Sequence, residues 1–264
     1  MPDDAWEGQS LKACSARVSA IPFALFAAAI GLAGLISACS QTVESKPAVL
    51  EQVDNGTMSP ALSGFFGNNF SLLQPGEKGQ AAMRYIAPNV QWAQYTKIML
   101  EPVEFWDNPD SSVSPTDQHM LTAYFYNQLK QDLQKDFTLV DQGGPGVMVI
   151  QVALLNASAA TPGLRSVSLV VPQLRLLNGL QSLATGSYAF VGSAEAAMKG
   201  TDSVTGQLLA AAIDKRAGGT AISAAAQWQW GDAENAMNYW SETITNRLLE
   251  AQGRSPAAQE TSAQ

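Results

Sequence analysis

The sequence is short of the side chains on which metal and thiol chemistry depends. Its 264 residues include 2 cysteines and 1 histidine. Structural zinc sites gather four Cys or His ligands, and a disulfide framework needs several cysteine pairs. We therefore expect no metal, no cofactor and no disulfide framework in this protein.

Charge is also scarce and unbalanced. Charged residues make up 14% of the chain, and 15 Lys and Arg face 23 Asp and Glu, for a formal net charge of −8. Nucleic-acid binding needs a basic face that displaces counterions, so we expect no nucleic-acid partner. Apolar residues make up 46% of the chain, which is enough for a sizeable core and excludes wholesale disorder.

One stretch near the N-terminus has no charge at all. It runs from Ile21 to Ile36, and at about 1.5 Å per residue it spans roughly 24 Å, less than a ~30 Å hydrocarbon core. Lys12 and Arg17 precede it and the small residues Ser37 and Ala38 follow it. This order is typical of a secretory signal peptide, and the alternative is an N-terminal membrane anchor.

The end of this stretch, Leu35–Cys39 (LISAC), resembles the bacterial lipobox. The resemblance implies that the signal peptide is removed before Cys39 and that Cys39 is lipidated; the alternative is an ordinary cysteine after a signal peptide. Two or three acyl chains hold a protein on a bilayer where one chain is marginal. Ser40 follows the cysteine, where an Asp would suggest retention at the inner membrane. We expect the periplasmic face of the outer membrane of a Gram-negative bacterium.

The chain is predicted to have four parts. Residues 1–38 are the signal peptide, and residues 39–86 hold the lipidated N-terminus, a flexible tether and an irregular docking segment. Residues 87–251 form a globular α+β domain, and residues 252–264 form a disordered tail. The tether is predicted for Ser40–Gly64 because prolines and glycines interrupt it and it has no clear periodicity.

Apolar patterning predicts the first elements of the globular domain. Short apolar segments at Lys97–Val103 and Val147–Leu155 are typical of strands. Between them, Ser114–Asp117 (SPTD) has the pattern of a helix start with Ser114 as N-cap. Apolar residues then continue at helical spacing to Leu133, which predicts an amphipathic helix.

The C-terminal third combines a hairpin with a second helix. Asp202–Gly206 (DSVTG) predicts a turn, and Gln207–Lys215 is expected to pair back as a strand. Asp232 is expected to cap a helix with one apolar stripe, made of Ala233, Ala236, Met237, Trp240, Ile244 and Leu248. The whole pattern predicts an α+β fold, a largely antiparallel sheet with two main helices packed on one face.

Several of these segments together resemble a known family. The region from Val90 to Ala251, with the lipobox, is similar to the bacterial lipoproteins of domain of unknown function 3313. The resemblance implies an exported lipoprotein and supplies no catalytic residues. It rests on Trp92 to Tyr95, Ile98–Val103, Asp202–Gly206, Ala211–Gly219 (AAIDKRAGG) and Gly231–Trp240 (GDAENAMNYW).

Two carboxylates flank the predicted hairpin. Asp202 and Asp214 lie on paired strands and would be the two carboxylates of a glycan hydrolase if they came together. The favoured alternative is structural: Asp202 caps the turn, and Asp214 pairs with Lys215, with Arg216 or with a nearby Arg on the same sheet. Both aspartates are therefore candidate binding residues, and no catalytic residue is assigned.

Two tryptophans precede the last helix. Trp228 and Trp230 alternate with glutamines, so an extended backbone would place both rings on one face, where they would stack on a sugar. The favoured alternative is that rings beside an apolar helix belong to the core.

The remaining chemical signals are weak. His119 lies in the first turn of the predicted helix without a nucleophile pattern around it, so we expect a surface histidine. Gly143–Gly146 (GGPG) lacks the Gly-Lys-Ser/Thr ending of a phosphate loop, and we expect a turn.

These observations predict an outer-membrane-anchored periplasmic lipoprotein that is not an enzyme. We expect its domain to bind another envelope protein or to act as an accessory of the cell envelope. One alternative is a periplasmic glycan hydrolase that uses the two aspartates. Another is a lipid- or small-ligand-binding module, which would show an apolar cavity between the sheet and the helices.

Overall fold

The computed structural model describes residues 42–47, 50, 59–106, 113–160, 192–218 and 229–255. The predicted signal peptide, Cys39 and Trp228 lie outside the described residues.

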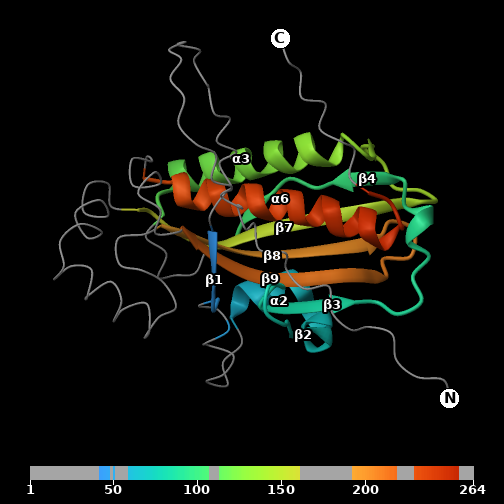
Figure 1. Ribbon diagram of the computed structural model, residues 1–264, viewed down its shortest axis with the longest axis horizontal. Helices are drawn as coiled ribbons and strands as arrows, with labels where there is room; N and C mark the ends of the chain where they lie inside the picture. The colour runs from blue at the N-terminus through green and yellow to red at the C-terminus, as the bar shows by residue number, and fades with distance from the viewer. Residues whose placement is uncertain are drawn as a thin grey trace, which may run out of the picture. The chain divides into compact units, whose positions relative to one another are not determined.

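One mixed sheet organises the described part of the chain (Figure 1). Its order is β2-β3-β9-β8-β7-β4-β6, with β1 also paired to β9 and β5 also paired to β7. Only the pairs β4–β6, β4–β7 and β5–β7 among these strands are parallel, so the predicted, largely antiparallel sheet is confirmed. The strands are β1 (Thr42–Ser45), β2 (Gln74–Pro75), β3 (Met83–Ile86), β4 (Lys97–Leu100), β5 (Glu104–Phe105), β6 (Thr138–Leu139), β7 (Val147–Ser158), β8 (Ser193–Asp202) and β9 (Leu208–Gly218).

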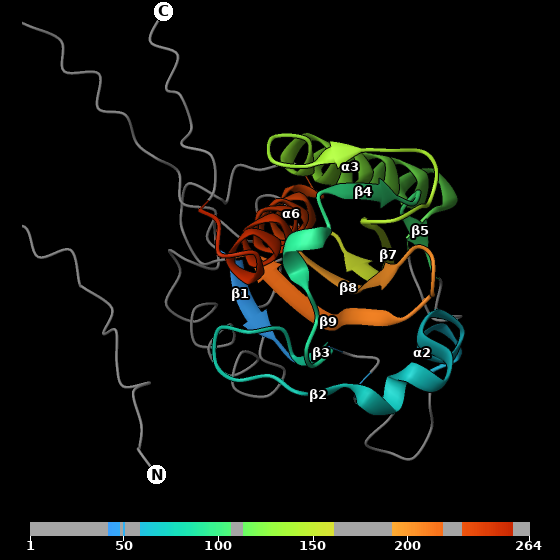
Figure 2. The same cartoon turned by 90° about the vertical axis from the view of Figure 1, so that its right-hand side faces the viewer.

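The helices lie on both faces of this sheet. The two long helices, α3 (Pro115–Leu133) and α6 (Gly231–Ala251), lie side by side on one face, and the short α2 (Pro60–Phe66) lies on the other (Figures 1 and 2). Two 3-10 helices, η1 (Gly67–Leu72) and η2 (Trp92–Gln94), complete the described elements. The predicted α+β class, with two main helices on one face, is confirmed.

The start of α3 follows the predicted capping pattern. The backbone N–H of Asp117 donates to Ser114 Oγ at 3.2 Å, and this hydroxyl donates to Asp117 Oδ2 at 2.7 Å. The two residues thus bond each other at the helix end, although Asp117 accepts from the Ser114 hydroxyl and not from its backbone N–H as in a capping box. The inner side of the helix is fully buried through Leu121, Phe125, Leu129 and Leu133.

The start of α6 differs from the prediction. The N-cap residue is Trp230, and Asp232 lies inside the first turn, where its Oδ2 accepts the backbone N–H of Gly192 at 2.8 Å. Asp232 therefore connects the start of α6 to the beginning of β8 by this hydrogen bond and does not act as the N-cap of its own helix. The end of β9 also approaches closely, because a Cβ at Gly218 would collide with the Asp232 carboxylate.

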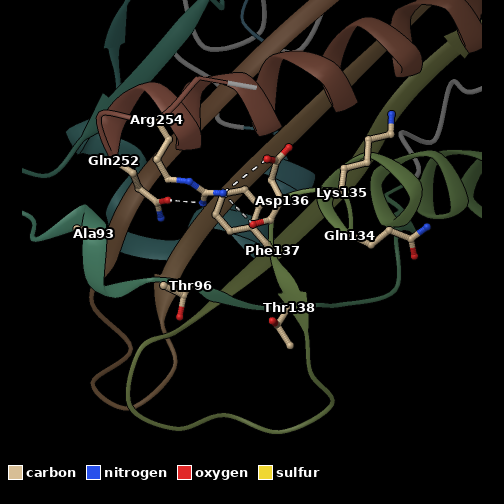
Figure 3. Close-up of a pocket in the computed structure, with 9 residues that line it drawn as sticks. All are labelled: Ala93, Thr96, Gln134, Lys135, Asp136, Phe137, Thr138, Gln252 and Arg254. Carbon is tan, nitrogen blue, oxygen red and sulfur yellow. Dashed lines mark hydrogen bonds and ion pairs between the residues drawn. The ribbon is translucent and has the colours of Figure 1, made fainter. Parts of the chain in front are cut away.

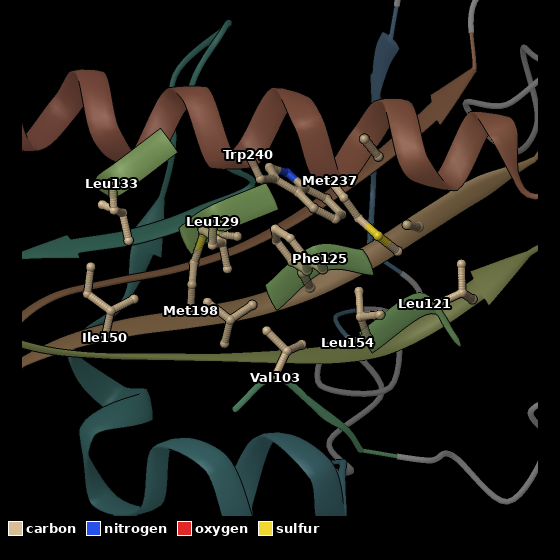
Figure 4. Close-up of a cluster of buried hydrophobic side chains, with 14 of the residues drawn as sticks. Val103, Leu121, Phe125, Leu129, Leu133, Ile150, Leu154, Met198, Met237 and Trp240 are labelled. Carbon is tan, nitrogen blue, oxygen red and sulfur yellow. The ribbon is translucent and has the colours of Figure 1, made fainter. Parts of the chain in front are cut away.

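The main core lies between the two long helices and the sheet (Figure 4). Phe125 of α3 and Trp240 of α6 meet with ring centroids 5.8 Å apart, above Leu154 of β7 and Met198 of β8. A second cluster fills the opposite face, where Leu62, Phe65 and Phe66 of α2 pack with alternate residues of the strands. Strand β7 is apolar on both faces because both clusters use it, which explains its continuous apolar sequence.

The apolar stripe of α6 is buried only in part. Ala233, Ala236, Met237 and Trp240 are buried as predicted, whereas Ile244 and Leu248 are only half-buried. Ile244 and Leu248 therefore lie over a less completely filled part of the sheet, although the neighbouring Leu249 is fully buried.

The predicted tether contains structure. Residues Thr42–Ser45 form β1, which pairs with Lys215–Gly218 of β9, and α2 begins at Pro60. The short β3 pairs only with Ala210–Ile213, so the end of β9 would be an open edge without β1. In these two places the segment Ser40–Gly64 is part of the fold, which therefore begins before Ala87.

Residues 252–255, which the sequence assigns to the tail, lie within the described part of the chain. Gln252 Nε2 donates to the backbone oxygen of Tyr95 at 2.8 Å, and the guanidinium of Arg254 lies 3.6 Å from Asp136 Oδ1. These contacts fix the chain for a few residues beyond α6. Within the described residues, no helix has the length and apolarity needed to cross a membrane.

Candidate functional site

Asp202 is a turn residue. Its Oδ1 accepts the backbone N–H groups of Val204 at 3.0 Å and Thr205 at 2.8 Å, and the Thr205 hydroxyl at 2.9 Å. Its Oδ2 accepts the hydroxyl of Tyr95 at 3.0 Å. These hydrogen bonds, above all that from the backbone of Thr205, lower the pKa of Asp202. The carboxylate is thus occupied by the turn, as the structural alternative predicted.

Asp214 has a different environment. It is 2% exposed, and its Oδ2 accepts Arg216 Nε at 2.7 Å and Trp240 Nε1 at 2.8 Å. Burial raises the pKa of Asp214, against the opposing effects of Trp240, Arg216 and the backbone of Ala82. The predicted pairing with Arg216 is confirmed, and so is the core position of Trp240.

The two aspartates do not come together. In the β8–β9 register, Asp214 lies opposite Ala196, six residues before Asp202 on β8. At about 3.3 Å per residue, the two positions are roughly 20 Å apart along the sheet. Glycan hydrolases place their two carboxyl groups about 5–9.5 Å apart. The hypothesis of a hydrolytic pair at Asp202 and Asp214 is therefore wrong.

Trp230 belongs to the core. It is 5% exposed, and its Nε1 donates to Asp117 Oδ1 at 3.1 Å. The indole thus connects the starts of α6 and α3 and does not offer a free stacking face.

The two weaker signals are resolved as predicted. His119 is exposed on the first turns of α3. Gly144 lies in a turn beside the hairpin, where Ser203 Oγ accepts its N–H at 2.9 Å and donates to its carbonyl oxygen at 2.9 Å. Gly146 has a φ of +73°, a backbone conformation that glycine adopts at little cost. The described residues contain no group of three or more His, Cys, Asp or Glu arranged to hold a metal ion.

A cavity of about 370 Å³ lies between the C-terminal half of α6 and the sheet. Strands β7, β8, β9 and β3 supply its floor and one wall, and α6 supplies the other wall. Its apolar lining includes Met148, Ile150, Met198, Ala210, Ala212, Trp92, Ile244 and Leu248.

Small residues of the sheet create this space. Ala210 and Ala212 alternate on β9 and face α6, and the adjacent β8 contributes Gly200. No large side chain rises from these three positions, so Ile244 and Leu248 of α6 remain half-buried above them. The usual close packing of a protein interior is absent at this place.

One end of the cavity is polar. Asp214 and Arg216 line it, and the guanidinium of Arg216 lies over the ring of Tyr239, with Cζ 4.3 Å from the centroid. Asp214 Oδ1 is buried, and the backbone of Ala82 is a further hydrogen-bond partner of this carboxylate. The cavity therefore combines a long apolar surface with one buried polar group.

Charged side chains lie around the cavity. Arg84 extends from β3, where it pairs with Ala212, and Arg247 of α6 is exposed and bonds Glu250 at 2.9 Å. Ile86 belongs to the same lining and is 52% exposed, so apolar surface continues from the interior to solvent.

A second depression, of about 530 Å³, lies at the C-terminal ends of α3 and α6 (Figure 3). Arg254 Nη2 donates to the backbone oxygen of Asp136 at 3.2 Å, and its guanidinium lies 5.4 Å from the ring centroid of Phe137. Its polar groups thus largely satisfy one another, and we assign this depression a structural role in holding the end of α6.

The cavity was not predicted as a site from the sequence. Its signal is the run of alanines at 210–212 in a predicted strand, flanked by the half-apolar stripe of the last helix. The alanines identify a strand with little side-chain volume, but not the helix that crosses it.

Comparison with known proteins identifies a family but no activity. The family model described as "Protein of unknown function (DUF3313)" matches residues 62–244. No curated protein matches the chain significantly.

The similar solved structures are remote. A PelC dodecamer from Paraburkholderia phytofirmans is 11% identical with a TM-score of 0.33, and the match covers 60% of this chain and 94% of that one. Protein XCC0632 from Xanthomonas campestris, of family DUF330, is 10% identical with a TM-score of 0.34, and the match covers 64% of this chain and 93% of that one. A likeness at this level carries neither a ligand nor an assembly over to this chain.

Proposed function

The chain belongs to the DUF3313 family of proteins of unknown function, and we propose that it is a non-enzymatic binding protein of the cell envelope. Its ligand is a small, largely apolar molecule held in the cavity between α6 and the sheet. The single observation that carries this proposal is the cavity of about 370 Å³ with its apolar lining.

The size and composition of the cavity support a ligand. Small-molecule sites typically measure about 300–1,000 Å³ and combine apolar walls with a few polar groups. This cavity has both features, because Asp214 and Arg216 lie at one end and alanines, methionines and aliphatic side chains line the rest. An apolar cavity between the sheet and the helices is also what the sequence analysis expects of a small-ligand-binding module.

We further propose that Cys39 is lipidated and that the protein lies on the periplasmic face of the outer membrane. The LISAC sequence supports lipidation. Only residues 40 and 41 separate Cys39 from β1, and three residue spacings reach about 11 Å at most. A lipidated Cys39 would therefore hold the domain close to the bilayer, which is a source of apolar molecules.

Binding is tested with the fluorescent apolar probe N-phenyl-1-naphthylamine and the purified domain. The wild type is expected to bind the probe saturably. Ala212→Phe should fill the floor of the cavity and weaken binding at least tenfold, and Ile244→Trp should do the same from the helix side. Ala123→Phe is the matched control, because Ala123 is exposed on α3. Absence of saturable binding, or unchanged binding by both filled variants, would contradict the proposal.

Lipidation has its own test. Cys39→Ala should leave an unprocessed or soluble product in a Gram-negative host, and Cys14→Ala should behave as the wild type. Normal processing and continued detergent partitioning of Cys39→Ala would show that the anchor is assigned wrongly.

A further inference from the structure

Most of the charged side chains that line the cavity are already paired. Asp214 and Arg216 form a buried pair at 2.7 Å, and Arg247 bonds Glu250 at 2.9 Å on the exposed side of α6. Neither pair carries a net charge, so neither of them requires a charged ligand.

Two further cations belong to the lining, Lys199 of β8 and Arg84 of β3. The ammonium of Lys199 lies on the opposite face of the sheet, where it donates to the backbone oxygen of Phe65 at 2.6 Å. Arg84 is half-buried, and its guanidinium makes no hydrogen bond or ion pair with any residue that the structure describes. Within this part of the chain, Arg84 is therefore the unpaired cation of the cavity.

Arg84 lies at the open edge of the apolar floor. It pairs with Ala212 of β9, which in turn lies opposite Met198 of β8, and paired residues of antiparallel strands share one face of the sheet. Neighbouring strands are about 4.8 Å apart, so this row of side chains extends roughly 10 Å inward from Arg84 to Met198. Ile86, two residues after Arg84, is 52% exposed. An apolar floor thus ends at a cation beside solvent.

We propose that the ligand is a single-chain amphiphile with an anionic head, a carboxylate or a phosphate, that binds the guanidinium of Arg84. Its alkyl chain lies over Ala212 and Met198, beneath Ile244 of α6. This assignment rests on the proposed function, because it identifies the class of ligand that occupies the same cavity. Both heads offer oxygens to the parallel N–H donors of a guanidinium, which binds carboxylate and phosphate in the same bidentate way.

Charge and desolvation favour an anion at this position. A bound alkyl chain excludes water from the half-buried guanidinium, and an unpaired charge is unfavourable where water is excluded. An anionic head gives Arg84 a partner, whereas a neutral head leaves it unpaired and an ammonium head adds a like charge. The protein has a net charge of −8, so its overall field favours cations, and a preference for anions requires a local cation.

The first test compares ligands that share one alkyl chain and differ at the head. Decanoate, decyl phosphate, 1-decanol and decylammonium each displace N-phenyl-1-naphthylamine from the wild-type domain at neutral pH, below the concentrations at which they form micelles. We expect at least one of the two anions to act at about tenfold lower concentration than decylammonium, since a charge-assisted hydrogen bond has an effect of that order. The anion that acts at the lower concentration identifies the head as carboxylate or phosphate.

The second test removes the cation. Arg84→Gln should raise the required concentration of the preferred anion about tenfold and that of 1-decanol less than twofold, because the alcohol places no charge beside residue 84. Lys130→Gln is the matched control, since it removes one positive charge from an exposed position of α3 outside the cavity. It should leave both concentrations unchanged. An unchanged anion in Arg84→Gln, or equal weakening of the anion and the alcohol, would overturn the assignment of Arg84.

The outcomes separate this inference from the proposed function. If the probe binds but decylammonium displaces it as well as both anions do, the assignment of an anionic head is wrong, while the cavity remains a binding site. If the probe itself does not bind, both proposals fail. Because the wild-type comparison of anion and cation needs no variant, an unfolded Arg84→Gln leaves the inference open to refutation.

Discussion

The two halves of α6 cover the same sheet but differ in how closely they pack against it. The N-terminal half buries Ala236, Met237 and Trp240 against Phe125 of α3 and the strands below. The C-terminal half also buries Leu249, but its Ile244 and Leu248 lie over Ala210 and Ala212 and line a cavity that Trp240 borders as well. The difference shows that an amphipathic stripe does not determine packing alone, because the volume of the facing strand decides whether the stripe is buried or lines a site.

The largest expected effect is a loss of unfolding free energy when the packed, N-terminal half of α6 is changed. Trp240→Ala removes a side chain that is 2% exposed and withdraws a hydrogen bond from Asp214, so it should lower the free energy of unfolding by about 3–5 kcal/mol. Ile244→Ala is the matched substitution in the C-terminal half of α6. It should lower the free energy of unfolding by about 1 kcal/mol, because the Ile244 side chain is only half-buried. Urea unfolding measures both. Equal losses would contradict the distinction between the two halves.

A smaller effect is expected where α6 begins. Gly218→Ala places a Cβ against the Asp232 carboxylate, which should disturb the bond to Gly192 and cost about 1–3 kcal/mol through overpacking. Gly144→Ala is the matched control, since a Cβ there meets nothing within 4 Å, and its effect should stay within about 0.5 kcal/mol. Thermal or urea unfolding of the two variants is the measurement. An unchanged free energy of unfolding in Gly218→Ala would mean that the start of α6 is not held tightly against β9.

The smallest effects concern pH and distinguish the two aspartates. The pKa of Asp202 is lowered by hydrogen bonds, so its contribution to stability is present above the ordinary Asp pKa of about 3.9 and is lost as pH falls through the lowered value. The pKa of Asp214 is raised by burial. The contribution of Asp214 is therefore present below about pH 3.9 and is lost as pH rises through the raised value.

These opposite signs are measured by urea unfolding of the wild type, Asp202→Asn and Asp214→Asn between about pH 3 and 7. The stability difference between the wild type and Asp202→Asn should grow with pH, and that between the wild type and Asp214→Asn should shrink. Parallel profiles for the two variants would contradict the contrast between an occupied turn residue and a buried residue of the cavity.

Local sequence predicted the parts of the fold whose partners are near in the chain. Ser114 and Asp117 cap α3 within three residues of each other. Asp202 organises its turn with Val204 and Thr205 in the same way. Such motifs close small hydrogen-bonded rings, so residue types at fixed spacing are sufficient to recognise them.

The features that were missed depend on distant segments. Asp232 bonds Gly192, 40 residues away, and so does not act as the predicted cap. Strand β1 forms because β3 leaves the end of β9 unpaired, which only the sheet reveals. The pairing of Asp214 with Arg216, two residues away, is one of the three alternatives that the sequence predicts, whereas its bond to Trp240, 26 residues away, is not predicted.

The central claim is that an apolar ligand occupies the hollow between α6 and β9. The most direct measurement is isotope-filtered NMR of the domain labelled with ¹³C at alanine methyl groups and saturated with 1-decanol. The account predicts nuclear Overhauser contacts from the alkyl chain to the methyls of Ala210 and Ala212, and none to Ala153 or Ala197, which are buried in the cluster on the opposite face of the sheet and do not line the cavity. Contacts to Ala153 or Ala197 instead, or no alanine contact at saturation, would contradict it.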